Sequence, residues 1–561
     1  MTETRPDRPH RPDRPHRALT VALTLYGALL VYCAFSYVPG PHDNDWPLLM
    51  WLAKHATWAD PSALAIGHYG FLQLVLVRLL LPVFGSTLAA AKALNIAATL
   101  LSAAAVFSIT ERLSGARRWA WLALAGFVFS AETLLTAQSE FGDPLATAFV
   151  GAGLWLLLRR RTPRALVLAG LLFGLAGTVR LHFMTFGWAA VLVVAGFEVG
   201  RRDAREEGSS AWLRRTLLFA IGLLAGQSPA LALNLAVHGQ PFSPIAHTFV
   251  GQVLFGVDGY DMASTYAAHP MSELLREHKL ALAELVATRL VEVPVGWLIA
   301  ALIGLAGLAL ARREALHPHR CLLWLLAAGY YVGFVTPAWG MTTRLLLPFA
   351  MLLSMSAACA MAALAPLLAP LFAPLFAPLF APLFAPLFAP RFGAPFAARQ
   401  RSPRGQTAVV VIGALLVFFN LRGERYTLRA MVANTNATLA RNRELGAVLH
   451  EGGLTEARQA FAGNWDRYPV DDPEFIPYYN FGFWNQLLPA FAAERPSPIK
   501  AMASPTAFAA FMRAHDVRFI VVPKESPFAT FAAFASGAAV PEGYARLADL
   551  PEDIVFRRLH P

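Results

Sequence analysis

An acidic cluster, His42-Asp43-Asn44-Asp45, follows the first apolar segment of a chain whose composition otherwise suits lipid. That segment, residues 18–38, carries no charged side chain and is long enough to cross a bilayer core, which needs roughly 20 apolar residues. We therefore expect Asp43 and Asp45 at the membrane–water boundary. A carboxylate there can accept a proton from an alcohol, so the cluster indicates general-base chemistry. The plainer alternative is that a loop entering water carries acids anyway.

A second acidic cluster, Gln138-Ser139-Glu140-Phe141-Gly142-Asp143-Pro144, lies between two predicted spans. Proline is tolerated at the start of a helix, so Pro144 predicts that a helix begins here. Asp143 then has two interpretations, as a residue of a functional site or as the N-cap of that helix.

Three cationic or titratable side chains lie at the predicted ends of later spans: Arg180, His182 and Arg344. Ionisable residues at membrane depth are costly and mark functional sites. The planar guanidinium matches phosphate oxygens, so the two arginines indicate binding of a phosphorylated lipid. Arginines that extend to the interface as anchors are the alternative.

The composition predicts a polytopic membrane protein. Hydrophobic residues make up 56% of the chain, charged residues only 15%, and the mean hydropathy is +0.47. The net charge of +11 does not indicate nucleic acid, because the arginines gather in short loops between apolar segments. These groups are Arg159-Arg160-Arg161, Arg201-Arg202, Arg214-Arg215, Arg312-Arg313 and Arg399/Arg401/Arg404.

Placing the basic loops inside fixes the predicted topology. Residues 1–17 form a disordered basic cytosolic tail, and residues 39–86 form a first outer loop whose segment 63–84 lies in the interface. With the first span, roughly 11 crossings follow. After 18–38, the predicted spans are 87–110, 119–137, 144–158, 165–180, 183–199, 216–236, 291–311, 321–338, 345–365 and 407–420. This order places both acidic clusters on the outer side.

The fold class predicted is thus an α-helical membrane domain, 18–420, followed by a soluble α/β domain, 421–561. The α/β assignment depends on a helix-like segment, SPTAFAAFMRA, followed by a strand-like one, HDVRFIVVP. Residues 238–290 form a long outer loop with an interfacial helix or lid. The APLF repeat, 366–392, is a low-complexity connector, because its regular prolines remove helix hydrogen bonds.

These features resemble the GT-C superfamily of membrane glycosyltransferases, nearest the protein O-mannosyltransferase and aminoarabinose-transferase branch (glycosyltransferase family 39-like). Asp45 and Ala53 are similar to that family's first-loop aspartate followed by alanine. Trp46 stands where the family often has an acid, which leaves Asp43 as the alternative match. Other similar segments are 67–85, 139–149, 229–244, 343–353 and 510–522.

The resemblance implies transfer of a sugar from a polyprenyl-phosphate-linked donor to an acceptor hydroxyl, by one inverting displacement on the extracytoplasmic side. Asp45 or Asp43 would be the general base, and Asp143 would hold hydroxyl groups of donor or acceptor. Arg344 would bind the lipid phosphate.

Further substrate-binding candidates are Arg180, His182, Glu140 and His68. Some members of the superfamily use a divalent metal and others do not. His42, Asp43 and Asp45 could supply ligands, but their spacing is not diagnostic, so no cofactor is assigned.

The expected partners are the lipid-linked sugar, membrane lipids and a glycan, lipid or protein acceptor. The residue usage favours a bacterial inner membrane with the site on the periplasmic side. A transporter or flippase of a lipid-linked precursor is the main alternative, and it predicts charges near mid-membrane rather than acids gathered at one face. A non-catalytic scaffold protein is the second alternative.

Overall fold

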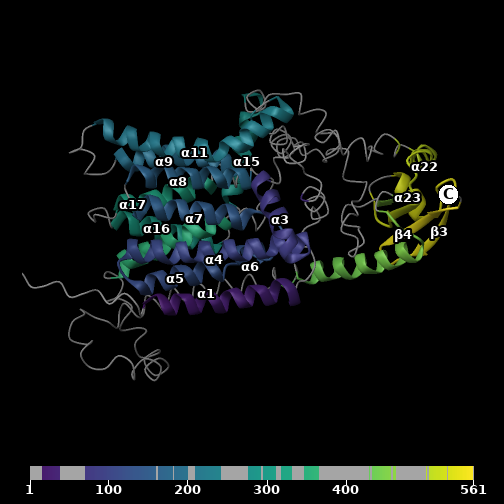
Figure 1. The fold of residues 1–561 in the computed structure, drawn as a ribbon, viewed down its shortest axis with the longest axis horizontal. Coiled ribbons are helices and arrows are strands. Elements are labelled where there is room, and N and C mark those ends of the chain that lie inside the picture. Colours follow the sequence, from purple (N-terminus) through teal and green to yellow (C-terminus); the bar gives the residue numbers. More distant parts are fainter. Residues whose placement is uncertain are drawn as a thin grey trace, which may run out of the picture.

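The computed structural model shows a bundle of long helices and, beyond one end of it, a smaller domain of strands and helices (Figure 1). The described residues are 15–37, 53, 70–159, 162–180, 182–199, 209–239, 241, 276–291, 295–310, 317–331, 346–365, 429, 432–456, 459–462, 501, 504–526 and 529–559. The predicted fold class, a helical membrane domain with a C-terminal α/β domain, is confirmed.

Within the described residues, four helices are long and apolar enough to cross a membrane. They are Arg17–Tyr37, Thr87–Ser114, Ser210–Val237 and Leu347–Ala365. The bundle elements are α1 (Pro15–Tyr32), η1 (Cys33–Tyr37), α3 (Phe71–Phe84), α4 (Thr87–Ser114), α5 (Arg117–Val128), α6 (Ala131–Thr136), α7 (Asp143–Arg159), α8 (Pro163–Val179), α9 (His182–Val199), α11 (Ser209–His238), α15 (Lys279–Val291), α16 (Val295–Leu310) and α17 (His317–Tyr330).

One predicted span differs from these helices. The predicted span 119–137 is two helices, because α5 ends at Val128 and the Ser130 hydroxyl caps α6 by accepting from the Thr133 amide. A separate helix, α15, precedes α16 within the predicted outer loop. Most of the predicted tail 1–17, the span 407–420 and the repeat 366–392 lie outside the described residues.

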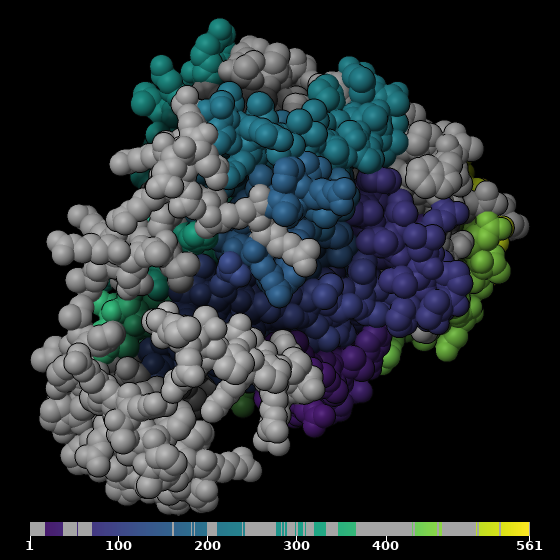
Figure 2. All heavy atoms as spheres, turned by 60° about the vertical axis from the view of Figure 1, so that its left-hand side comes forward, coloured from purple at the N-terminus to yellow at the C-terminus, as the bar shows by residue number. Residues whose placement is uncertain are grey.

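The first helix, α1, lies along one flank of the bundle (purple in Figure 2). The Tyr26 hydroxyl donates to the carbonyl of Val128, 2.9 Å away, and Lys92 Nζ donates to the carbonyl of Ala34, 3.0 Å away. The second bond joins the first turn of η1 to the second turn of α4. The chain therefore leaves its first span beside the N-terminal turns of α4.

Two described arginines, Arg215 and Arg320, lie at the opposite end of the bundle. Arg320 Nη2, near the start of α17, donates to the carbonyl of Leu113 at the end of α4, 3.0 Å away. Arg215 Nη1 on α11 lies 3.2 Å from Glu198 Oε2 on α9. The topology predicted from the basic loops stays a prediction, since most of those loops lie outside the described residues.

Helices α8 and α11 approach each other through paired glycines. A Cβ at Gly222 would lie 2.0 Å from the carbonyl oxygen of Val167, and one at Gly170 would lie 1.9 Å from that of Phe219. Gly174 and Gly226, one turn further along each helix, are equally close to the opposing backbone. Small residues four apart permit this contact between membrane helices.

The C-terminal domain contains a four-stranded sheet of order β1-β2-β4-β3 among its described residues. Its elements are β1 (Ala460–Ala462), α22 (Pro505–Ala514), β2 (Phe519–Pro523), α23 (Ala529–Ala535), β3 (Tyr544–Asp549) and β4 (Asp553–Arg558). Strand β2 pairs parallel with β1 and antiparallel with β4, which also pairs antiparallel with β3. The predicted helix–strand succession is confirmed as α22 and β2.

A buried tyrosine holds β3 to the segment before β2. The Tyr544 hydroxyl donates to the carbonyl of Val517, 2.6 Å away, and burial raises the pKa of Tyr544 to about 12. We expect Tyr544→Phe to destabilise this domain by about 1–3 kcal/mol, since the buried carbonyl loses its partner. Hydrogen exchange of β2 in the full chain measures this loss.

The exposed Ser536→Ala in the same domain is the control, and its effect should stay within about 0.5 kcal/mol. Because the folded-state pKa of Tyr544 is raised, the contribution of its hydroxyl to the free energy of unfolding is complete below pH 10. This contribution is lost as the pH rises towards 12. Equal protection in wild type and Tyr544→Phe at neutral pH would contradict this assignment.

Candidate functional site

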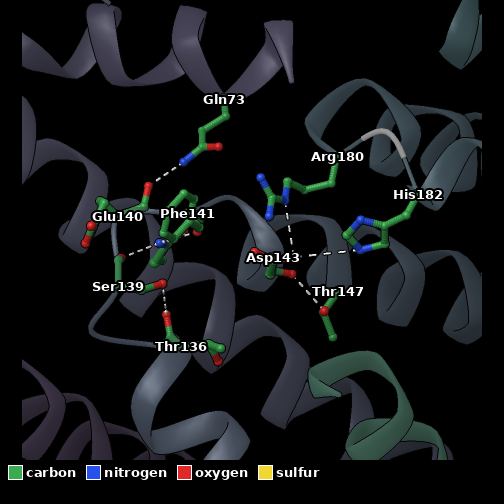
Figure 3. Close-up of polar contacts among 10 residues, drawn as sticks. Gln73, Thr136, Ser139, Glu140, Phe141, Asp143, Thr147, Arg180 and His182 are labelled. Carbon is green, nitrogen blue, oxygen red and sulfur yellow. Dashed lines mark hydrogen bonds and ion pairs between the residues drawn. The ribbon is translucent and has the colours of Figure 1, made fainter. Parts of the chain in front are cut away.

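Three of the predicted site residues come together at the end of the bundle where α3 lies. Asp143 is the first residue of α7, Arg180 directly follows α8, and His182 is the first residue of α9. All three side chains point toward one another (Figure 3). Since α7 and α8 are antiparallel neighbours joined by a short loop, the start of one and the end of the other must meet.

Asp143 is fully buried and pairs with Arg180. Its Oδ1 lies 3.2 Å from Arg180 Nε, and the side chain of Arg180 is only 4% exposed. The imidazole Nε2 of His182 lies 3.7 Å from the same Oδ1, within ion-pair range but longer than a hydrogen bond. The other carboxylate oxygen, Oδ2, is buried and has no hydrogen-bond partner among the described residues.

This geometry decides between the two interpretations of Asp143. Helix α7 begins at Asp143 itself, and the Asp143 side chain points to Arg180 and His182. The helix's first backbone bond runs from the amide of Ala146 to the carbonyl of Gly142. The N-cap interpretation is therefore wrong, and Asp143 belongs to a buried cluster of charged and titratable groups.

Aromatic rings surround the Asp143–Arg180 pair. The Arg180 guanidinium carbon lies 5.3 Å from the ring centroid of Phe141, and the ring of Tyr330 on α17 lies 6.3 Å from that of His182. Tyr330 interacts electrostatically with both Asp143 and Arg180. Tyr330 was not predicted as a site residue, because nothing in the sequence distinguishes it from other aromatic residues of an apolar span.

Glu140 is also buried, three residues before Asp143. It interacts electrostatically with Lys92, which is buried on α4 and was not predicted as a site residue. The sequence does carry a signal for Lys92: it is the one lysine of the apolar segment 87–110.

The segment before Asp143 is held through its backbone. Gln73 Nε2 on α3 donates to the carbonyl of Glu140, 2.5 Å away. Asn95 Nδ2 on α4 donates to the carbonyls of Ser139 and Phe141, both 2.6 Å away. Gly142 packs so closely that a Cβ there would lie 2.7 Å from Gln73 Oε1.

Four predicted site residues, Asp43, Asp45, His68 and Arg344, lie outside the described residues, as does most of the predicted loop 238–290. Within the described residues, no group of three or more His, Cys, Asp or Glu side chains is arranged to hold a metal ion. The Asp143 cluster does not fit a divalent cation, because the guanidinium of Arg180 already occupies one carboxylate oxygen.

Known structures with the same architecture are membrane glycosyltransferases. The chain is similar to ArnT from Cupriavidus metallidurans bound to undecaprenyl phosphate, with 14% identity, a TM-score of 0.56 and coverage of 96% of this chain and 98% of that one. The apo form of the same protein gives 13% identity and a TM-score of 0.58 over the same shares. No family model and no curated sequence matches the chain.

An apo oligosaccharyltransferase from Archaeoglobus fulgidus is also similar, with 14% identity, a TM-score of 0.52 and coverage of 94% of this chain and 72% of that one. Both similar proteins are GT-C glycosyltransferases. At these identities the likeness establishes the fold. This chain is thus an integral membrane protein with the GT-C fold, as the resemblance of its motifs predicted.

Proposed function

We propose that the protein is a membrane glycosyltransferase that takes a sugar from a polyprenyl-phosphate donor and transfers it to an acceptor hydroxyl. The observation that carries this proposal is the buried Asp143–Arg180–His182 cluster at one end of a GT-C bundle. In Figure 1, the C-terminal domain lies beyond that same end. The fold alone would not distinguish an enzyme from a protein that only binds lipid.

The proposed reaction is one inverting displacement. The acceptor oxygen attacks the anomeric carbon of the sugar, and the bond from that carbon to the phosphate oxygen breaks. The acceptor's proton passes to Asp45 or Asp43, and polyprenyl phosphate leaves. This leaving group is already stable, so charge stabilisation matters more than acid catalysis.

Asp143 and the arginines have separate roles in this proposal. The unpartnered Oδ2 of Asp143 accepts a hydrogen bond from a hydroxyl of donor or acceptor, while Arg180 and His182 fix the carboxylate through Oδ1. Arg344 binds the lipid phosphate, with Glu140 and His68 as further substrate contacts. No step of this reaction passes through a metal. The spacing of His42, Asp43 and Asp45 leaves open whether these residues bind one.

The first loop lies within reach of the cluster. Lys92 bonds the carbonyl of Ala34, near the start of η1, and Asn95 on the same helix α4 contacts the segment before Asp143. Asp45 follows Tyr37 by eight residues, which span at most roughly 29 Å when extended. We further propose that this end faces the periplasm of a bacterial inner membrane, since the described arginines Arg159 and Arg215 lie at the other end.

The test of the base is transfer from radiolabelled polyprenyl-phosphate sugars to total membrane acceptors by purified protein in vesicles. We expect Asp45→Asn to lower the transfer rate by roughly 10²–10⁴-fold, which is typical for loss of a general base. Asp43→Asn should then retain most of the activity.

Asp60→Asn, in the same predicted outer loop, is the matched control and should transfer at the wild-type rate. If Asp43→Asn is the inactive variant, Asp43 is the base. Full activity of both variants would contradict the catalytic assignment of the cluster.

A further inference from the structure

We infer that Gln73 and Asn95 are positioning residues, which hold the segment 139–141 by its backbone so that Asp143 meets Arg180 in a fixed geometry. This inference rests on the proposed function and extends it to two residues from two other helices. Figure 3 shows the Gln73 amide pointing at the Glu140 carbonyl, across the segment from the Asp143 cluster.

The hydrogen bonds form an unusual pattern for a short connection. Three successive carbonyls, those of Ser139, Glu140 and Phe141, each accept from a side-chain amide rather than from a helix backbone. Since carbonyls only accept, the NH₂ groups of both amides must face the segment, which fixes their orientation. Gln73 and Asn95 are both fully buried, so water cannot replace these bonds.

Both amide oxygens point away from these carbonyls. Gln73 Oε1 and Asn95 Oδ1 are buried without a hydrogen-bond partner among the described residues. Burying such acceptors unsatisfied is costly, but apolar side chains at these two positions would leave the carbonyls of residues 139–141 without their donors. The cost indicates that the placement of segment 139–141 itself is what the amides secure.

The placement matters because the segment leads directly into the site. Phe141 lies against the Arg180 guanidinium, and Asp143 follows after one glycine. Gly70, at the start of α3, packs directly on the end of α8, since a Cβ there would lie 2.0 Å from the Val179 carbonyl oxygen. Helices α3 and α4 thus set where the Asp143 carboxylate stands relative to Arg180.

The test compares Asn95→Leu with Thr99→Val, a buried control one turn further along α4. Thr99 Oγ1 donates to the carbonyl of Asn95, within its own helix, and has no hydrogen bond to the segment among the described residues. We expect Asn95→Leu to lower kcat by roughly 10²-fold with little change in KM, since a misplacement of about 1 Å costs that much. Thr99→Val should leave kcat unchanged.

A second comparison separates positioning from a general loss of stability. In an Asp143→Asn background, Asn95→Leu should lower kcat no further, because the group it positions is already gone. It should still shift Tm as it does in the wild-type background. An equal further loss of kcat in both backgrounds would overturn the inference.

Hydrogen exchange of the peptide over residues 137–145, in the full chain in nanodiscs, provides a readout independent of transfer. Asn95→Leu should raise the exchange rate of this peptide about 10-fold, and Thr99→Val should not. Unchanged exchange would show that the amides do not hold the segment. If the wild type transfers no sugar while exchange rises in Asn95→Leu, the proposed function fails. The two amides then hold the segment only as a structural feature, and the positioning role is overturned.

Discussion

Asp143→Asn should abolish most sugar transfer, with kcat/KM lower by roughly 10²–10³-fold, as when one preorganised charged hydrogen-bonding group is removed from a site. The substitution preserves shape but removes the charge that Arg180 faces at 3.2 Å. It also replaces one acceptor oxygen with a donor. Steady-state transfer by the purified variant in vesicles gives the value directly.

The same substitution leaves a buried guanidinium without its carboxylate, so a loss of stability of about 3–5 kcal/mol is expected beside the loss of activity. The double variant Asp143→Asn/Arg180→Gln separates the two effects, because neither partner is then charged. Its Tm should recover towards the wild-type value while transfer stays low. Recovery of transfer in the double variant would show that Asp143 only neutralises the charge of Arg180 and binds no substrate.

Gly222→Ala should unfold or loosen the bundle at the α8–α11 contact. The new Cβ would lie 2.0 Å from a backbone oxygen, which cannot rotate away as a flexible side chain can. The helices must separate, and overpacking of this kind costs about 1–3 kcal/mol or more. Thermal denaturation in detergent or nanodiscs should show a clearly lower Tm and less folded protein.

Gly196→Ala on α9 is the matched control, since a Cβ at Gly196 meets no atom of the described residues within 4 Å. Alanine favours helix over glycine by about 1 kcal/mol, so this variant should be neutral or slightly more stable. An equal loss of Tm for both variants would mean that the α8–α11 contact is not what Gly222 secures.

The sequence was sufficient to predict the class of fold. The arginine-rich loops fix the predicted parity of the spans, and this parity alone predicts that Asp143, Arg180 and His182 lie on one side. Their direct contact was not predicted, because Asp143 and Arg180 are 37 residues apart and the registry of α7 against α8 depends on packing.

The residues that support the site were harder to find in the sequence. Gln73 and Asn95 act through backbone carbonyls, and no pattern of residue types reveals which carbonyls lie opposite a given amide. The break between α5 and α6 was not predicted for another reason: the apolar run continues through Phe129, and only the capping Ser130 marks the break.

The most direct test of the central claim follows one donor carrying two labels, on the sugar and on the phosphate, in vesicles that contain only the purified protein and an acceptor fraction. The proposal predicts that the sugar label appears on the acceptor while an equal amount of bare polyprenyl phosphate forms, and that Asp143→Asn suppresses both. An intact donor that crosses the bilayer without cleavage would contradict it and identify a transporter.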